Sequence, residues 1–273
     1  MHPAIRISVR VLSALVLVAG IGGAGAAEAP PASGREWLDM TYPYDEKTVY
    51  WPTADPFRLE KVFAGETDGG YWYASNNYSA SEHGGTHVDA PRHFARGGRT
   101  IDQVPLGEWI APAVAVDVRE ACEKDPDYLL TPADLESWEK RHGKIPAGAW
   151  LVMVSGWDRR FYPDRSKVLG TGKTGAAAVP ELHFPGFSPE AVEWAVSQRG
   201  IIGIAIDTPS IDRGQSTDFR THRVVCGHDR LALENLANAE KLPPRGATLY
   251  VIPMLIAGGT GAPARVFARL PKK

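Results

Sequence analysis

Short apolar runs bounded by turn residues recur along the chain, and this pattern predicts buried strands rather than long helices. The runs cover residues 113–118, 151–154, 201–207, 248–253 and 265–270. Only two segments carry helix signals. Thr131-Pro132 begins one segment and Gly143 ends it, while Ser188-Pro189 begins the other and Gly200 ends it. Strands mixed with few helices predict an α/β (α+β) domain.

The first residues have the pattern of an export signal. Arg6 and Arg10 precede an apolar stretch over residues 11–21, and small residues follow it. We therefore expect a signal peptide over residues 1–26, a Pro/Ala/Gly-rich tether over 27–36 and one domain over 37–273. A retained membrane anchor is the alternative, but the apolar stretch is short for a bilayer. The expected location is periplasmic or secreted.

Composition narrows the class of protein. The chain has 273 residues, 30 basic and 32 acidic side chains and 44% hydrophobic residues, which excludes disorder, collagen and coiled coil. This near-neutral balance gives no basic surface for nucleic acid. Export permits a disulfide between Cys122 and Cys226, but two buried free thiols are the favoured interpretation.

One segment concentrates groups that bind metals. Three of the eight histidines lie between residues 83 and 93, where glycine and proline interrupt helical geometry. In an extended chain His83, His87, Asp89 and His93 project to one side. A solvated strand edge is the ordinary interpretation of any single histidine, whereas the four groups together favour a divalent metal site.

The pattern His83-x-Gly-Thr-His87-x-Asp89-Ala-Pro-x-His93 resembles the signature of the cyclase-like metal-dependent hydrolases. This family includes bacterial kynurenine formamidases and isatin hydrolases. The resemblance extends over most of the domain, through residues 183–186, 207–212, 215–218 and 258–263. It implies a swivelling β/β/α fold around a mixed barrel-like sheet, usually in a homodimer or higher oligomer.

The resemblance also implies roles for particular residues. The positions of His83, His87 and Asp89 bind Zn²⁺ or Mn²⁺ in the family, and the position of His93 is the catalytic acid/base. Formamidase members bind a second ion at the positions of His222 and Glu234, whereas isatin-hydrolase-like members hold one Mn²⁺ with a glutamine that matches Gln215. This chain has His222 and Glu234 as well as Gln215. It is therefore compatible with either one ion or two.

Four residues are candidates for the substrate side of the site. Trp51 and Trp72 can provide flat rings for an aryl ligand, although the alternation around Trp72 also fits ordinary strand packing. Trp157 and His183 lie in segments that resemble the substrate side of the family's site.

The resulting hypothesis is a hydrolase that cleaves a C–N bond of an aryl formamide, amide or lactam, such as N-formylkynurenine or isatin. A metal-activated water attacks, and His93 takes its proton and returns it to the leaving nitrogen. The alternatives are an ester or lactone hydrolase with the same site, or an exported metal- or ligand-binding protein without turnover. The presence of His93 argues against the binding protein, since binding alone needs no free acid/base.

Overall fold

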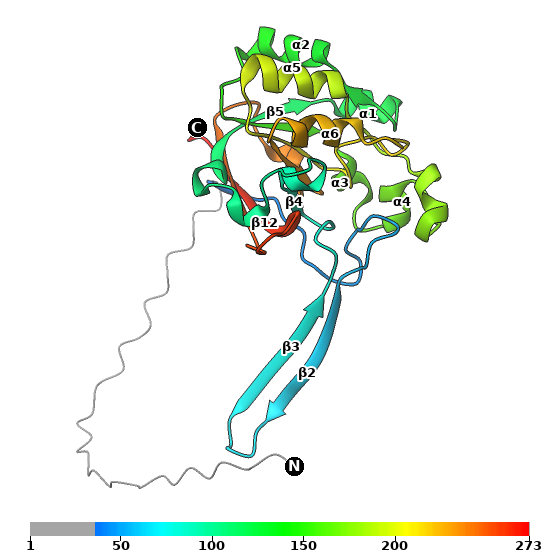
Figure 1. The fold of residues 1–273 in the computed structure, drawn as a ribbon, viewed down its shortest axis with the longest axis vertical. Helices are drawn as coiled ribbons and strands as arrows, with labels where there is room; N and C mark the ends of the chain where they lie inside the picture. Colours follow the sequence, from blue (N-terminus) through cyan, green and yellow to red (C-terminus); the bar gives the residue numbers. More distant parts are fainter. Residues whose placement is uncertain (1–35, 273) are drawn as a thin grey trace, which may run out of the picture. The chain divides into compact units, whose positions relative to one another are not determined.

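The computed structural model describes residues 36–272, so the expected signal peptide and nearly all of the expected tether lie outside the described residues. The fold is built on a mixed sheet that closes into a seven-stranded barrel (Figure 1). Its strands, in spatial order, are β12 (Gly261–Arg269), β11 (Ala247–Pro253), β5 (Ile110–Asp117), β7 (Trp150–Val154), β9 (Gly203–Ile206), β10 (Leu231–Glu234) and β4 (His87–Asp89). The ring closes because β4 pairs with both β10 and β12. The barrel-like sheet expected from the sequence is confirmed.

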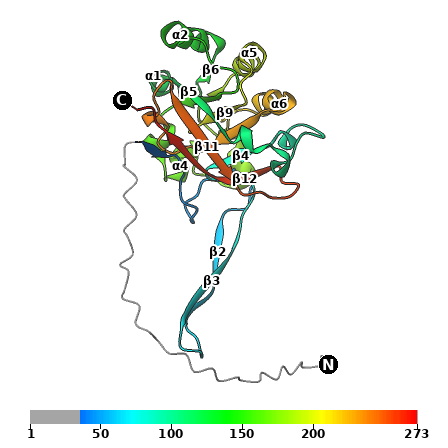
Figure 2. The same ribbon diagram turned by 90° about the vertical axis from the view of Figure 1, so that its left-hand side faces the viewer.

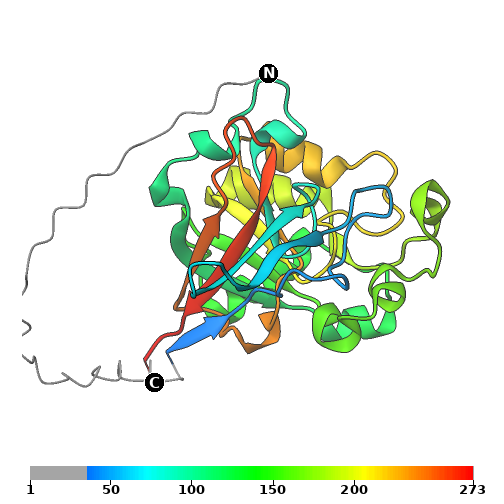
Figure 3. The same cartoon turned by 90° about the horizontal axis from the view of Figure 1, so that it is seen from below.

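The strand directions are mixed. Strands β5, β7, β9 and β10 run parallel to their neighbours within that group, while β11, β12 and β4 pair antiparallel. Strand β1 (Trp37–Asp39) adds to the free side of β12, as Figure 3 shows from below. All five apolar runs of the sequence lie in strands, with boundaries shifted by a few residues.

Helices cover the outer face of the parallel strands (Figure 2). They are α1 (Arg119–Lys124), α2 (Pro132–His142), α5 (Pro189–Arg199) and α6 (Arg220–Gly227). The predicted ends of α2 and α5 are confirmed, since Thr131 and Ser188 cap their first turns through side-chain oxygens. Alternation along the strands separates two cores, one inside the barrel and one beneath these helices.

The remaining elements connect this framework. They are α3 (Trp157–Phe161), α4 (Arg165–Leu169), the short pair β6 (Leu129–Leu130) and β8 (Gly186–Phe187), and five 3₁₀ turns: η1 (Pro91–His93), η2 (Ile101–Gln103), η3 (Leu106–Glu108), η4 (Gly175–Glu181) and η5 (Ala239–Lys241). None of the helices in the described part of the chain is long and apolar enough to cross a membrane.

Strands β2 (Arg58–Glu66) and β3 (Trp72–Ser79) form a separate hairpin, and we call it the arm. They pair with each other in a sheet of their own, and no residue of either strand is buried. Trp72 therefore lies in an exposed strand. Cys122 and Cys226 are both buried free thiols, as the sequence favoured.

Candidate metal centre and active site

Strand β4 brings two candidate ligands to one face of the sheet. His87 and Asp89 are two residues apart and share that face, while Val88 points into the barrel core. In the antiparallel pairing with β10, Glu234 lies directly opposite His87. Such cross-strand neighbours have their Cβ atoms about 5 Å apart. The register of two strands thus places a carboxylate beside an imidazole.

Helix α6 contributes the next group. His222 is buried, and its Nε2 lies 3.2 Å from an oxygen of Glu234 and 3.4 Å from Oδ2 of Asp89. Its Nδ1 lies 2.6 Å from Oδ2 of Asp212, which also accepts the backbone N–H of His222. Asp212 therefore fixes the imidazole with Nε2 toward the carboxylates.

Two buried polar atoms in this cluster lack a hydrogen-bond partner, His87 Nε2 and Asp89 Oδ2. The other ring nitrogen of His87, Nδ1, lies 2.9 Å from the carbonyl oxygen of Gly85 and donates its hydrogen to it, which holds the ring with Nε2 facing the carboxylates. Unpaired buried polar atoms are costly unless a ligand or ion satisfies them. The donor set of imidazole nitrogens and carboxylate oxygens fits a divalent cation.

Asp89 belongs to two groups of potential ligands. Atoms of His87, Asp89 and Glu234 lie within 4.8 Å of one another, and so do atoms of His83, Asp89 and His93. A shared carboxylate is compatible with one ion or with two neighbouring ions.

His83 and His93 lie beside this cluster. Their rings stack with centroids 3.7 Å apart. His83 Nδ1 lies 2.7 Å from Asp89, and its Nε2 lies 2.9 Å from the Thr260 hydroxyl. Residue 261 must be glycine for this arrangement, because a Cβ there would lie 2.5 Å from the His83 ring. His93 sits on the 3₁₀ turn that follows β4, not on an extended strand. The extended segment expected over residues 83–93 is thus limited to three residues, since Pro91 begins a turn.

The pKa values reflect this crowding. Burial acts to lower the pKa of His87, but its contacts with Asp89 and Glu234 outweigh burial and raise the pKa to about 9. Burial also opposes ionisation of Asp89, yet the surrounding histidines hold its pKa well below the ordinary value. His93 differs, because burial lowers its pKa to about 3. At neutral pH His93 is therefore a neutral imidazole.

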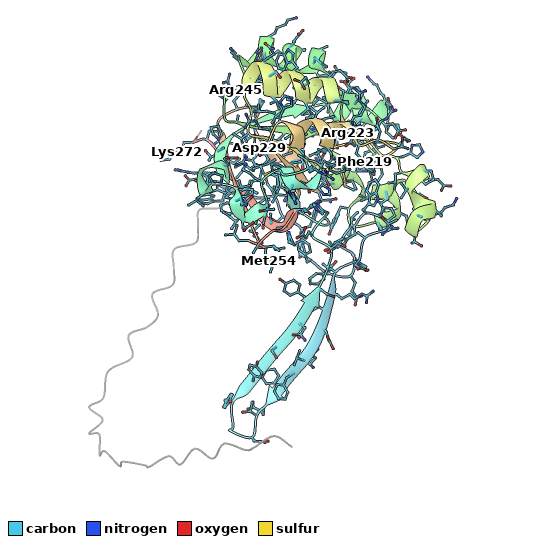
Figure 4. All side chains as sticks on the ribbon, viewed as in Figure 1. Phe219, Arg223, Asp229, Arg245, Met254 and Lys272 are labelled. Atoms are coloured by element: carbon cyan, nitrogen blue, oxygen red, sulfur yellow. The ribbon has the colours of Figure 1, made fainter. Side chains whose placement is uncertain are left out.

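A cavity of about 300 Å³ opens onto these groups. Candidate ligands and His93 form part of its wall, and Trp51, Phe94 and Phe219 form an aromatic part. The Phe219 ring lies 5.8 Å from Trp51 and 5.6 Å from Phe94, centroid to centroid. Phe219, labelled in Figure 4, has a positive φ of 49°, an uncommon conformation for a bulky residue that often marks functional sites.

The structure brings together most of the residues that the sequence predicted. His83, His87, Asp89, His93, His222 and Glu234 form one cluster, and Trp51 lines its cavity.

Four other predicted site residues lie elsewhere. The Gln215 amide contacts His183, and His183 pairs with Asp127, so these side chains form an exposed cluster of their own. Trp157 packs in a separate apolar cluster and donates its ring N–H to the Val168 carbonyl. Trp72 lies in the arm. None of the four lines the described cavity. Their placement gives no support to Gln215 as a ligand or to the other three as substrate contacts.

Three site residues were missed from the sequence. Asp212 stands in a polar turn and Phe219 immediately precedes α6, while Phe94 directly follows the histidine motif. Phe94 adjoins that motif and Asp212 lies in the segment 207–212 that carries the family resemblance, so both had a signal. The position of Phe219 depends on how α6 packs on the sheet.

Comparison with known proteins agrees with this geometry. A sequence model of the family described as "Putative cyclase" matches residues 38–213. The chain is 35% identical over 223 residues to the isatin hydrolase of Roseibium aggregatum, covering 78% of this chain and 81% of that protein. It is 31% identical over 189 residues to the kynurenine formamidase of Salinibacter ruber, covering 69% and 76%.

The structure is similar to that of isatin hydrolase A from Ralstonia solanacearum, with a TM-score of 0.77 and 32% identity over 86% of this chain and 91% of that one. The match over more than half of the chain, together with these relatives, shows that the chain belongs to the cyclase family.

Proposed function

We propose that this chain is a metal-dependent hydrolase that cleaves a C–N bond of a small aryl formamide, amide or lactam. One observation carries the proposal. The atoms His87 Nε2 and Asp89 Oδ2 are buried without a hydrogen-bond partner, and they face His222 and Glu234 beside an aromatic-walled cavity. The activities in the names of its relatives, isatin hydrolase and kynurenine formamidase, support the choice of bond.

We assign Mn²⁺ or Zn²⁺ as the cation, in one or two copies, because mixed imidazole and carboxylate donors suit both. His87, Asp89, His222 and Glu234 would hold one ion, and His83 would share Asp89 with a second. A divalent cation here would act as a Lewis acid toward the substrate carbonyl and toward water.

His93 carries the proton in this proposal. It lines the cavity, stacks on His83 and is neutral because burial lowers its pKa. Its ring nitrogen accepts a proton from the attacking water, and the same proton then passes to the leaving nitrogen as the C–N bond breaks. Each turnover therefore returns His93 to its neutral state.

The cavity favours a small flat substrate. Its volume of about 300 Å³ is at the lower end of the range of small-molecule sites. Trp51, Phe94 and Phe219 provide faces and edges for an aryl ring. A single or fused ring bearing a formamide or lactam, such as N-formylkynurenine or isatin, matches these walls.

Metal analysis of the purified protein tests the first half of the proposal. Wild type should retain Mn or Zn, and His87→Ala should lose most of it, because one of few ligands is removed. His228→Ala is the matched control, since His228 is exposed and pairs with Glu193. Retention of a full equivalent of metal in His87→Ala would contradict the site.

Kinetics test the second half. With aryl formamides and lactams as substrates, His93→Ala should lower kcat by roughly 10²–10⁴-fold while metal content stays near wild type. If His93→Ala loses its metal, His93 is a ligand rather than the proton carrier. Turnover of aryl esters without any turnover of amides would favour the ester hydrolase instead.

We also propose that the protein is exported to the periplasm or secreted, and that it works as a homo-oligomer, a dimer or tetramer. The basic and apolar pattern of residues 1–26 supports export. Intact-mass measurement of protein from its native host should show loss of about the first 26 residues, and a full-length cytoplasmic product would contradict export.

A further inference from the structure

Glu82 and Thr260 form a short hydrogen-bonded chain behind His83. The Thr260 hydroxyl lies 2.6 Å from Oε2 of Glu82 and 2.9 Å from Nε2 of His83. The backbone N–H of Thr260 donates to the same Glu82 oxygen over 3.0 Å. On its other side, the His83 ring places Nδ1 2.7 Å from Oδ1 of Asp89. The chain therefore runs from a partly exposed carboxylate to the carboxylate that both groups of candidate ligands share.

The backbone around Thr260 is shaped for these two contacts. A Cβ at residue 259 would lie 3.0 Å from the Glu82 carboxylate, and a Cβ at residue 261 would lie 2.5 Å from the His83 ring. Gly259 and Gly261 therefore let both side chains approach Thr260 closely. The Thr260 carbonyl also accepts the backbone N–H of the residue that follows β4. The hydroxyl is thus held in place beside the ring by the backbone that carries it.

The directions of the hydrogen bonds determine which nitrogen of His83 carries hydrogen. A carboxylate only accepts, and a hydroxyl has a single hydrogen to donate. The contact with Glu82 has the length of an O–H···O⁻ bond, so the Thr260 hydrogen points to Glu82. Toward His83 the hydroxyl can then only accept, and Nε2 must be the donor. In the neutral ring, the lone pair of Nδ1 therefore faces Asp89. Two acceptors at this distance repel each other, and a cation bound to both removes the conflict.

The other two histidines of the cluster present the opposite nitrogen. In His87 the Gly85 carbonyl occupies Nδ1, and in His222 Asp212 does so, which leaves Nε2 toward the carboxylates in both. In His83 the occupied nitrogen is Nε2 and the inward one is Nδ1. Partners of this kind fix the tautomer and the orientation of ligating histidines.

We propose that Glu82 and Thr260 are positioning residues that make His83 a metal ligand through Nδ1. This inference rests on the proposed function, because it requires a divalent cation at Asp89. The Thr260 hydroxyl holds the hydrogen of His83 on Nε2, and the Glu82 carboxylate sets the direction of that hydroxyl. Without the pair, the ring can adopt the other tautomer, in which Nδ1–H donates to Asp89 and no lone pair is left for the ion.

Nitrogen-15 NMR of histidine-labelled protein loaded with Zn²⁺ tests the assignment directly, since this d¹⁰ ion is diamagnetic. In wild type the His83 ring should carry hydrogen on Nε2 and metal on Nδ1, whereas His87 should show the reverse. The signals of His83 are assigned by their absence in His83→Asn. A hydrogen on Nδ1 of His83 in the loaded protein would overturn the proposal.

Variants of the pair test its effect on metal binding. Thr260→Val should weaken Zn²⁺ binding by roughly 10- to 100-fold, the usual effect of losing such a partner, and should shift His83 toward the Nδ1–H tautomer. Thr260→Ser keeps the hydroxyl and should restore both properties. Glu82→Gln should keep the tautomer, because its amide oxygen can accept both hydrogens of Thr260. Thr171→Val is the matched control, since the Thr171 hydroxyl also donates to a glutamate, Glu181, and should leave Zn²⁺ binding unchanged.

The outcomes separate this inference from the proposed function. Zn²⁺ binding by wild type with an equal affinity in Thr260→Val would overturn the role of the pair and leave the proposed function standing. A wild type that binds no divalent cation would overturn both. A less stable metal-free Thr260→Val with an unchanged His83 tautomer would mean that Thr260 serves only the fold. If Thr260→Val does not fold, the tautomer of His83 in wild type decides.

Discussion

At the residue scale, the orientation of His222 depends on one carboxylate. Asp212 accepts from the first backbone N–H groups of α6 and lies 2.6 Å from the His222 ring. It therefore both caps the helix and holds Nδ1, which leaves Nε2 for the cluster. Carboxylates behind ligating histidines fix the ring and raise its basicity. We regard Asp212 as a positioning residue for this reason.

Replacing Asp212 by Asn should weaken metal binding by roughly 10- to 100-fold, the usual effect of losing such a partner. Both carboxylate oxygens of Asp212 accept hydrogen bonds, one from the Thr221 N–H and the other from the His222 N–H and ring. The asparagine side chain has only one acceptor oxygen, so it cannot accept all of these bonds. Titration of metal-free protein with Zn²⁺ measures the change. Asp164→Asn is the control, because Asp164 caps α4 and contacts no candidate ligand. Equal affinities in wild type and Asp212→Asn would show that Asp212 serves only as a cap.

At the element scale, capping residues and apolar runs predicted those helices and strands whose formation depends on the local sequence. The helices beginning after Thr131 and Ser188 follow from capping chemistry, and five of the seven barrel strands follow from apolar runs, whereas β4 and β10 do not. The arm was not predicted as a hairpin, and only the alternation around Trp72 indicated a strand there. The reason is that apolar side chains lie on both of its faces, so its strands have no single apolar face.

The site was predictable only where its residues are close in sequence. His87 and Asp89 share a strand face, so the pattern of alternation was enough. His222 and Glu234 join them through packing of α6 and register of β10, which spacing does not encode. The family resemblance supplied that pair, but it also suggested Gln215, which lies against His183 instead.

The junction of β7 and β9 contains a buried acid outside the cavity. Asp207 accepts hydrogen bonds from the backbone N–H groups of Ser155 and Gly156. Burial, together with nearby Asp158, raises the pKa of Asp207 to about 7. The folded state therefore holds a proton that the unfolded chain releases near pH 4. This contribution to stability is complete below about pH 4 and is lost as the pH rises through about 7.

The variant Asp207→Asn removes this titration. The free energy of unfolding of wild type minus that of the variant should fall as the pH rises from about 4 to about 8, by at most about 1.4 kcal/mol per pH unit. Urea unfolding at several pH values measures the difference, in which the titrating groups that do not interact with Asp207 cancel. A difference that is constant or rises with pH would mean that Asp207 is ionised in the folded protein.

At the scale of the whole molecule, the proposed metal site would also be a source of stability. Its ligands come from β4, α6 and β10, so an ion would link three elements that are distant in sequence. Without it, the structure buries His87 Nε2 and Asp89 Oδ2 unpaired. Ligands that bind only the folded state stabilise it by mass action.

Removing metal with a chelator should therefore lower Tm, and adding it back should restore Tm. A free ion concentration of about 100 times Kd adds about 2.7 kcal/mol, which corresponds to roughly 5–10 °C for a domain of this size at about 2–4 °C per kcal/mol. Differential scanning calorimetry measures the shift. His87→Ala, as the control, should show little response to metal, and an equal response would place the ion elsewhere.

Strand β4 has a consequence for how related chains diverge. Its three residues close the barrel by pairing on both sides, while two of them carry the candidate ligands. Val88 faces the core, so selection for folding alone keeps it apolar. His87 and Asp89 are candidate ligands, so selection for the reaction keeps them. In a descendant that had abandoned turnover, we would expect position 88 to stay apolar while positions 87 and 89 drift. Three consecutive positions thus record separately whether a lineage has kept its shape and whether it has kept its reaction.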